Sequence, residues 1–165
     1  MEIELCGYKV QIDEEDYDRV MQHKWHLISQ YYINTRGRVY FCGNFRTEDN
    51  KRYRSSLHRY IMKCAYHDGI IIDHINNDPL DNRKANLRKC SPSENMHNMK
   101  INKKNTTGYK GVVLVPETGK YRARIRINRK RISLGNYDTP EEAYAAYCEG
   151  SKKYHGEFGR AESIF

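Results

Sequence analysis

The sequence predicts an α+β protein made of two small modules that a basic linker joins. Between residues 70 and 99 a strand pattern, a polar loop, a second strand pattern and a helix start follow one another closely. Residues 101–107 are polar and basic, as is typical of a linker. Beyond residue 108 three strand patterns precede one helix pattern. We therefore expect domains at 1–100 and 108–165, separated by the linker.

The segment before residue 70 predicts a mixed extension of strands and short helices. Its β-rich stretches are bounded by turn residues, and the acidic run at 13–16 suits the positive end of a helix. We expect strands at 2–12, 25–35, 39–46 and 53–57, helices beginning at 13 and 56, and turns at 36–38 and 49–50.

The stretch 70–99 contains the residues that carry chemistry. Ile70–Ile72 is a β-branched run of the kind that forms a buried strand, and it ends at Asp73 and His74. An Asn- and Asp-rich loop follows, and residues 86–90 predict a returning strand. Neighbours on a regular strand point to opposite faces, so Asp73 and His74 can share a site only if the strand ends or distorts there.

A capped helix is expected after this hairpin. The run Ser-Pro-Ser-Glu at 91–94 has a capping residue, a proline at the first helical position and a glutamate that completes a capping box. Asn95 therefore lies in the first turns. The Asp73 carboxylate and the Asn95 amide oxygen suit a hard cation such as Mg²⁺ or Mn²⁺, and a neutral His74 can take a proton from water. Together they predict metal-assisted phosphodiester hydrolysis.

The run DHINNDPLDNRKANLR at 73–88, followed by SEN at 93–95, resembles the HNH endonucleases, in particular phage and intron-encoded homing endonucleases with a ββα-metal fold. The resemblance implies that Asp73 and Asn95 hold one divalent ion, that His74 is the general base and that Asn86 braces the hairpin loop. His97 is an alternative second ligand. Two residues along a helix is a rotation of about 200°, so Asn95 and His97 should not both face the ion, and we favour Asn95. A turn-rich surface loop is the simpler alternative for the whole run.

Residues 57–62, LHRYIM, are similar to a segment just upstream of the motif in that family. The resemblance makes His58 and Arg59 candidates for contact with a phosphate near the cut. The alternative is a helix that packs through its apolar residues and leaves His58 and Arg59 in solvent.

The charge of the chain indicates an anionic partner. The formal net charge is +8, and residues 100–131 hold eleven Lys or Arg against the single acidic residue Glu117. Nucleic acid is the commonest partner of such a surface. Within the linker we expect Lys103 and Lys104 to follow a DNA backbone.

Composition also restricts location and metal chemistry. The sequence has no apolar stretch long enough to cross a bilayer and no signal peptide, so we expect a soluble cytoplasmic protein. The five cysteines include no Cys-x-x-Cys pair, which predicts reduced thiols. A zinc site is disfavoured by the spacing of its conceivable ligands, Cys42, Cys64, His67 and Cys90.

The second half predicts a three-stranded antiparallel sheet with one helix on it. Strands are expected at 109–115, 120–128 and 129–137 around a turn at 116–119, and a helix from about 138. In the middle strand Arg122, Arg124 and Arg126 alternate with apolar residues, so one face carries only guanidinium groups. Arg131 continues this face on the third strand. Such a face suits the major groove of DNA, although a merely solvated face is the alternative.

This half resembles the AP2 DNA-binding domain over about Gly108–Arg160, through the runs GYKGV, KYRARI, ISLGNYDTPEEA, AAY and KKYHGEF. The resemblance implies a sheet face that reads bases and phosphates. The matching positions are Lys110, Tyr121, Arg122, Arg124, Arg126 and Arg131. Val113, Val115 and Ser133 depart from the plant members, which changes the expected sequence preference.

These observations predict a metal-dependent endonuclease that hydrolyses double-stranded DNA at a specific site, without a membrane partner. The resemblance implies a homing endonuclease of phage or mobile-intron origin, and a monomer is favoured. A restriction or defence HNH nuclease is the alternative among enzymes. An AP2-type DNA-binding regulator with an inert HNH part is the alternative outside them.

Overall fold

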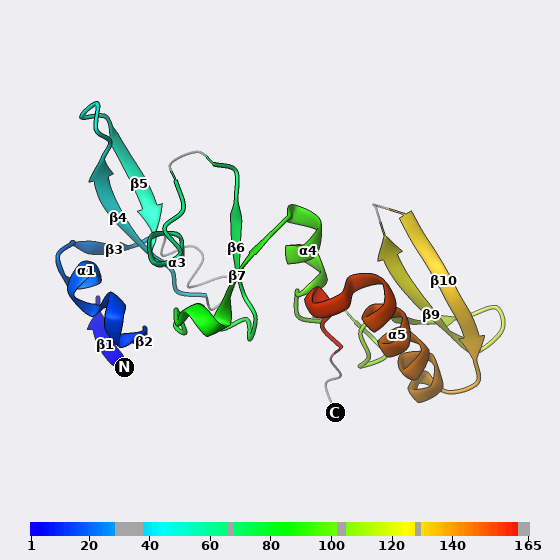
Figure 1. Cartoon of the computed structure of the whole chain (residues 1–165). Coiled ribbons are helices and arrows are strands. Elements are labelled where there is room, and N and C mark those ends of the chain that lie inside the picture. Colours follow the sequence, from blue (N-terminus) through cyan, green and yellow to red (C-terminus); the bar gives the residue numbers. More distant parts are fainter. Residues whose placement is uncertain (29–37, 66–67, 102–104, 128–129, 162–165) are drawn as a thin grey trace. The chain divides into compact units, whose positions relative to one another are not determined.

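The computed structural model describes residues 1–28, 38–65, 68–101, 105–127 and 130–161 (Figure 1). The chain forms two compact units, Met1–Ser91 and Pro92–Phe165, and each is described by itself. Both combine helices with small antiparallel sheets, so the predicted α+β class is confirmed. The boundary lies before Pro92, whereas the sequence suggested residue 100. No helix within the described ranges is both long and apolar enough to span a membrane.

The first unit contains three antiparallel sheets and several short helices. Its sheets are β1-β2, β3-β4-β5 and β6-β7. In chain order its elements are β1 (Glu2–Leu5), β2 (Tyr8–Gln11), η1 (Glu14–Asp16), α1 (Tyr17–Met21), β3 (Trp25–Leu27), β4 (Phe41–Arg46), β5 (Arg52–Ser56), α3 (Leu57–Ile61), β6 (Ile71–His74), η2 (Lys84–Asn86) and β7 (Leu87–Cys90).

The predicted single strand at 2–12 is wrong, because the chain turns back on itself there. Cys6 and Gly7 have φ values of 53° and 80°, and strands β1 and β2 pair on either side of them. Positive φ at both central residues is the geometry of a two-residue hairpin turn. The predicted strand at 25–35 is observed over Trp25–Leu27, and the predicted turn at 36–38 falls mainly on residues outside the described ranges.

One apolar core holds the first unit together. α3 supplies Leu57 and Ile61, which are 1% and 0% exposed, and they pack with Phe41 of β4 and with the β1-β2 hairpin. The indole Nε1 of Trp25 donates to the carbonyl of Val20 at 2.9 Å, which fixes α1 against β3. The hairpin β6-β7 joins this core through Ile72 and Leu87. The N-terminal extension and the β6-β7 hairpin therefore share one core.

The second unit is a three-stranded sheet with a long helix. Its elements are α4 (Pro92–His97), β8 (Val112–Val115), β9 (Lys120–Ile127), β10 (Lys130–Tyr137), α5 (Pro140–His155) and η3 (Gly156–Phe158). The strand order is β10-β9-β8, all antiparallel. Thr139 caps α5 in a capping box with Glu142. Ala143 of α5 packs with Val112 and Ala123 of the sheet, so α5 covers one face (Figure 1).

Candidate active site

The β6-β7 hairpin positions the first two candidate residues. The register is regular to the end of β6, with Asp73 opposite Arg88 and His74 opposite Leu87. Side chains alternate along a regular strand, so Asp73 and His74 leave the backbone on opposite faces. His74 is the last residue of β6, and the chain turns immediately after it. Both side chains are buried, at 7% and 6% exposure.

Asp73 is held by the arginine across the hairpin. Its Oδ2 accepts from Nε of Arg88 at 3.1 Å and from Nη2 at 3.0 Å, and both side chains are largely buried. The pair places a carboxylate oxygen at a fixed point beside the strand end. A carboxylate is a suitable ligand for a hard divalent cation, which would compete with the guanidinium for it.

The orientation of the His74 ring follows from Asn82. Nδ2 of Asn82 donates to the carbonyl of Pro79 at 3.0 Å, which turns its Oδ1 toward Nε2 of His74 at 3.3 Å. An acceptor at Nε2 assigns the ring proton to that nitrogen, so Nδ1 is the basic atom of the neutral imidazole. Burial lowers the pKa of His74 from its usual value, against the opposing effects of Asn82 and Asp73. The ring is therefore a neutral base near pH 7.

Two further rings border His74. The centroid of the His58 ring lies 5.2 Å from that of His74, and the Tyr40 ring lies 6.2 Å from it. Nε2 of His58 also lies 3.0 Å from Oγ of Ser56. Burial, with smaller effects of His74 and Arg59, lowers the pKa of His58 to about 3. A neutral His58 adds no charge beside His74 at physiological pH.

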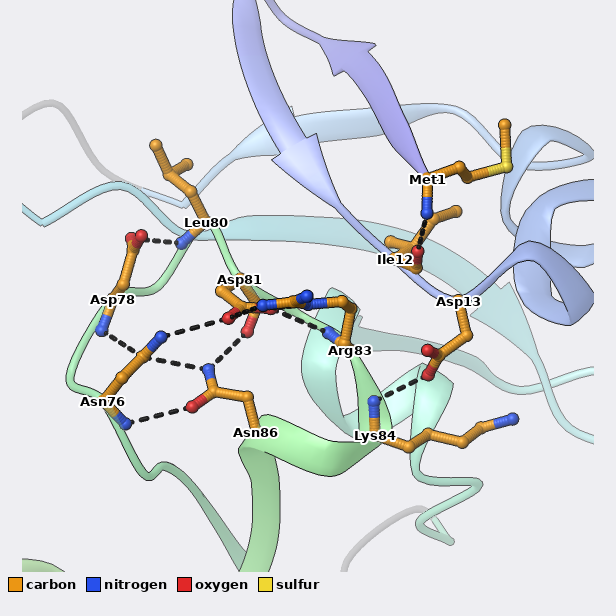
Figure 2. Close-up of polar contacts among 10 residues, drawn as sticks. All are labelled: Met1, Ile12, Asp13, Asn76, Asp78, Leu80, Asp81, Arg83, Lys84 and Asn86. Carbon is orange, nitrogen blue, oxygen red and sulfur yellow. Dashed lines mark hydrogen bonds and ion pairs between the residues drawn. The ribbon is translucent and has the colours of Figure 1, made fainter.

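Asn86 holds the loop between the two strands (Figure 2). Its Nδ2 donates to Oδ1 of Asn76 at 2.9 Å and to the carbonyl of Asp81 at 2.8 Å. Its Oδ1 accepts from the backbone N–H of Asn76 at 3.0 Å. Asp81 in turn binds Arg83 through two hydrogen bonds of 2.8 Å, which lower the pKa of that carboxyl. The loop is thus fixed by side chains at both of its ends.

The N-terminal extension binds the same loop. Gln11 of β2 donates its N–H to the carbonyl of Leu80 and accepts from the N–H of Asn82, both at 2.8 Å. The N–H of Lys84 donates to the carboxylate of Asp13 at 2.7 Å, as Figure 2 also shows. Asn82 is therefore fixed between strand β2 and the ring of His74.

Asn95 and its alternative His97 lie on α4, in the second unit, whereas Asp73, His74 and Asn86 lie in the first. The ring of His97 stacks on that of His155, with centroids 3.5 Å apart and planes at 12°. Nζ of Lys110 donates to the carbonyls of His97 and Met99 at 2.8 and 2.7 Å. These contacts bind α4 to the second unit and explain the boundary before Pro92.

The predicted DNA-contacting residues lie in several environments. Arg59 is bound internally, since its guanidinium pairs with Asp68 at 2.6 Å and donates to backbone carbonyls. Lys103 and Lys104 lie outside the described residues. Lys110 binds the end of α4, as described above. Tyr121 packs with the α5-side cluster, on the face of β9 opposite the arginines.

The arginine face of the second unit is arranged as the alternation predicts. Arg122, Arg124 and Arg126 are exposed, whereas Ala123 and Ile125 between them are 0% and 2% exposed. Arg131 lies opposite Arg126 in the β9-β10 register, and Nε of Arg122 donates to Asn136 at 2.9 Å. Directly opposite residues of an antiparallel pair share a face, so these side chains form one exposed basic surface.

Two residues at the site were not foreseen from the sequence. Asn82 was placed only in the loop, and Arg88 only in the motif, yet they position His74 and Asp73. The role of Arg88 could have been predicted, because its position opposite Asp73 follows once the ends of the hairpin are known. The role of Asn82 could not, since its position depends on pairing with Gln11 far away in the sequence.

An antiparallel hairpin with a buried Asp-His pair at its strand end and an asparagine-held loop is the arrangement expected of an HNH nuclease domain. Comparison with known proteins agrees, because the family described as HNH endonuclease matches residues 57–97. The chain therefore contains an HNH endonuclease domain. That segment runs from α3 through the hairpin to the end of α4.

Two viral proteins are similar over longer stretches. Protein 3.8 of Escherichia phage T7 is 35% identical over 92 residues, which cover 56% of this chain and 75% of that protein. The uncharacterized HNH endonuclease L560 of Acanthamoeba polyphaga mimivirus is 28% identical over 149 residues, which cover 86% of this chain and 72% of that protein. No solved structure matches the chain.

Proposed function

We propose that this protein is a metal-dependent endonuclease that hydrolyses phosphodiester bonds of double-stranded DNA. The observation that carries the proposal is the buried His74 at the end of β6, within the segment that matches the HNH family. Its ring is neutral, and Asn82 directs its basic nitrogen, Nδ1, away from the loop amide. Such a group is suited to accept a proton from an attacking water.

Asp73 and Asn95 are the proposed metal ligands, and Asn86 is the proposed brace of the loop. The donor set fits a hard cation in kind, because both ligands offer oxygen atoms. No cluster of three His, Cys, Asp or Glu side chains suited to a metal occurs among the described residues. The proposed site has one aspartate and one asparagine and does not depend on such a cluster. A bound Mg²⁺ or Mn²⁺ would stabilise negative charge on the phosphate and on the leaving oxygen.

The second unit is proposed to hold the DNA as an AP2-like domain. Its exposed arginine face is suited to bind phosphates and to enter the major groove. A sheet surface of this size adds recognition that a small hydrolytic site cannot supply alone. We infer more specifically that the protein cleaves one DNA site as a homing endonuclease of a phage or mobile element. The motif and the viral relatives support this inference.

Nicking of supercoiled plasmid tests the proposal directly. The protein should relax the plasmid with Mg²⁺ and not with EDTA, and His74→Ala should lower the rate at least about 100-fold, because a general base contributes that much or more. The variant should bind DNA as tightly as the wild type. Equal cutting by His74→Ala would remove this residue from the mechanism, and a wild type that binds but never cuts would leave only a DNA-binding protein.

Asn82 offers a matched test of the ring orientation. Asn82→Asp loses the donor to Pro79 but keeps an oxygen acceptor opposite Nε2, whereas Asn82→Leu has a similar size and neither group. We expect Asn82→Asp to retain most of the cutting rate and Asn82→Leu to lose it. Equal rates for the two variants would show that the proton on His74 is placed by another group.

A further inference from the structure

The sheet β3-β4-β5 of the first unit has one apolar face and one exposed face. Trp25, Phe41 and Phe45 pack on the core side. In the β4-β5 register Asn44 lies opposite Arg54 and Arg46 lies opposite Arg52. Residues directly opposite each other share a face, and so do residues two apart on one strand. These four side chains, all exposed, therefore form a single surface, here called the ribbon face.

The ribbon face is basic at a cost to the hairpin itself. Like charges directly opposite each other destabilise an antiparallel pair, and Arg46 and Arg52 stand in that position. Neither strand contains an acidic residue. Across the part of the chain that the structure describes, no carboxylate lies within ion-pair distance of these arginines. Arg46 donates to Oδ1 of Asn50 in the turn, and Arg54 donates to Sγ of Cys42. Neutral donors could make both contacts, so the fold does not require the positive charge of this face.

The same side of the sheet leads to the candidate active site. Along β5 the row continues from Arg52 and Arg54 to Ser56, whose hydroxyl contacts Nε2 of His58 at 3.0 Å. The ring of His58 lies 5.2 Å from that of His74. Figure 1 shows β4 and β5 as a ribbon that extends beyond the neighbouring helices α1 and α3, with its turn at the far end.

Strand geometry gives the reach of this row. The four steps along the strand from Ser56 to Arg52 span roughly 13 Å. One DNA strand carries a phosphate for about every 3.4 Å of axis, so the row covers roughly four nucleotides. A two-stranded ribbon also fits the major groove. The dimensions and the charge both match a DNA duplex.

We propose that the ribbon face, formed by Asn44, Arg46, Arg52 and Arg54, binds the phosphate backbone of the DNA duplex a few nucleotides from the bond that is cut. The inference rests on the proposed function and adds a second DNA-binding surface, in the same unit as His74. It fixes where the duplex lies against the site, whereas the arginine face of the second unit is a separate surface.

The test uses a double variant that carries both Arg46→Gln and Arg52→Gln. A second double variant with the same change in net charge is the control. Lys9→Gln with Lys63→Gln also removes two positive charges from exposed side chains of the first unit that are not part of the ribbon face. Binding of the full-length chain to a short DNA duplex is measured in EDTA over a series of salt concentrations. Each lost phosphate contact should lower the slope of log K against log salt by about 0.9, so the arginine variant should lose nearly 2 and the lysine control none.

Two further measurements keep the result interpretable. The variant with Arg46→Lys and Arg52→Lys keeps both charges and should keep the slope. The midpoint of thermal unfolding of the glutamine variant should change little, because removal of the like-charge pair offsets the loss of the exposed hydrogen bonds from Arg46 to Asn50. A slope equal to wild type, or an equal loss in the lysine control, would overturn the inference. A preference of the ribbon face for an RNA duplex over DNA would overturn it as well. Because binding is measured without metal, a chain that never cuts leaves this test intact.

Discussion

Replacement of Asn86 by alanine tests the most connected side chain of the candidate site. Asn86 is 8% exposed and makes three hydrogen bonds, two from Nδ2 and one to Oδ1. A net value of about 1 kcal/mol for each bond, together with the buried carbonyl of Asp81 left unsatisfied, gives a loss of about 2–4 kcal/mol. For a unit the size of residues 1–91, this corresponds to a fall in Tm of about 10–25 °C.

The assay is calorimetry of the full chain, combined with plasmid nicking well below the lowered Tm. Asn136→Ala is the control, because that exposed residue accepts a single hydrogen bond from Arg122, and its loss should change stability by less than about 0.5 kcal/mol. Asn76→Ala and the double variant with Asn86→Ala complete a cycle, whose coupling energy should exceed about 0.5 kcal/mol. A Tm for Asn86→Ala within a few degrees of wild type, or strictly additive effects, would refute the argument that this side chain fixes the loop.

Three further outcomes follow from the structure. Gly111→Ala should destabilise the second unit by several kcal/mol, because Gly111 has a φ of 78° and an added Cβ would lie 2.0 Å from the ring of Tyr147. A Tm close to that of the wild type would contradict this expectation. His58 has its pKa lowered to about 3, so the unfolded chain binds the proton more strongly, and stability should fall as pH drops from 6.5 toward 3 by about 1.4 kcal/mol per unit at most. His58→Gln should flatten that part of the stability profile, and an unchanged profile would exclude His58 as its source. Arg124→Gln with Arg126→Gln should weaken DNA binding and lower its salt slope by nearly 2, which titration of a labelled duplex measures, and an equal slope would show that this face does not touch DNA.

The second unit shows what residue patterns can predict. Alternation of arginine with apolar residues in β9 predicted both faces of the strand, because burial against α5 leaves only one register possible. The β1-β2 hairpin was not predicted, because its turn lacks a clear signal in the sequence. Its turn uses Cys6 with a positive φ, and cysteine is not a residue that signals such a turn.

The candidate site was predictable only as far as local sequence determines it. Asp73, His74 and Asn86 follow from one short motif, and the structure brings them to one hairpin and its loop. The grouping of α4 with the second unit depends on His155 and Lys110, which come later in the chain. Contacts of that kind depend on tertiary packing, which no local pattern encodes.

The pairing of Gln11 with Leu80 and Asn82 has a consequence for dissection of the protein. The loop of the β6-β7 hairpin receives part of its backbone hydrogen bonding from a strand some seventy residues earlier. A fragment trimmed to residues 57–97 would therefore lose the partner that seats Asn82 beside the imidazole. A fragment for grafting or for engineering therefore has to keep β2 together with the whole matched segment 57–97.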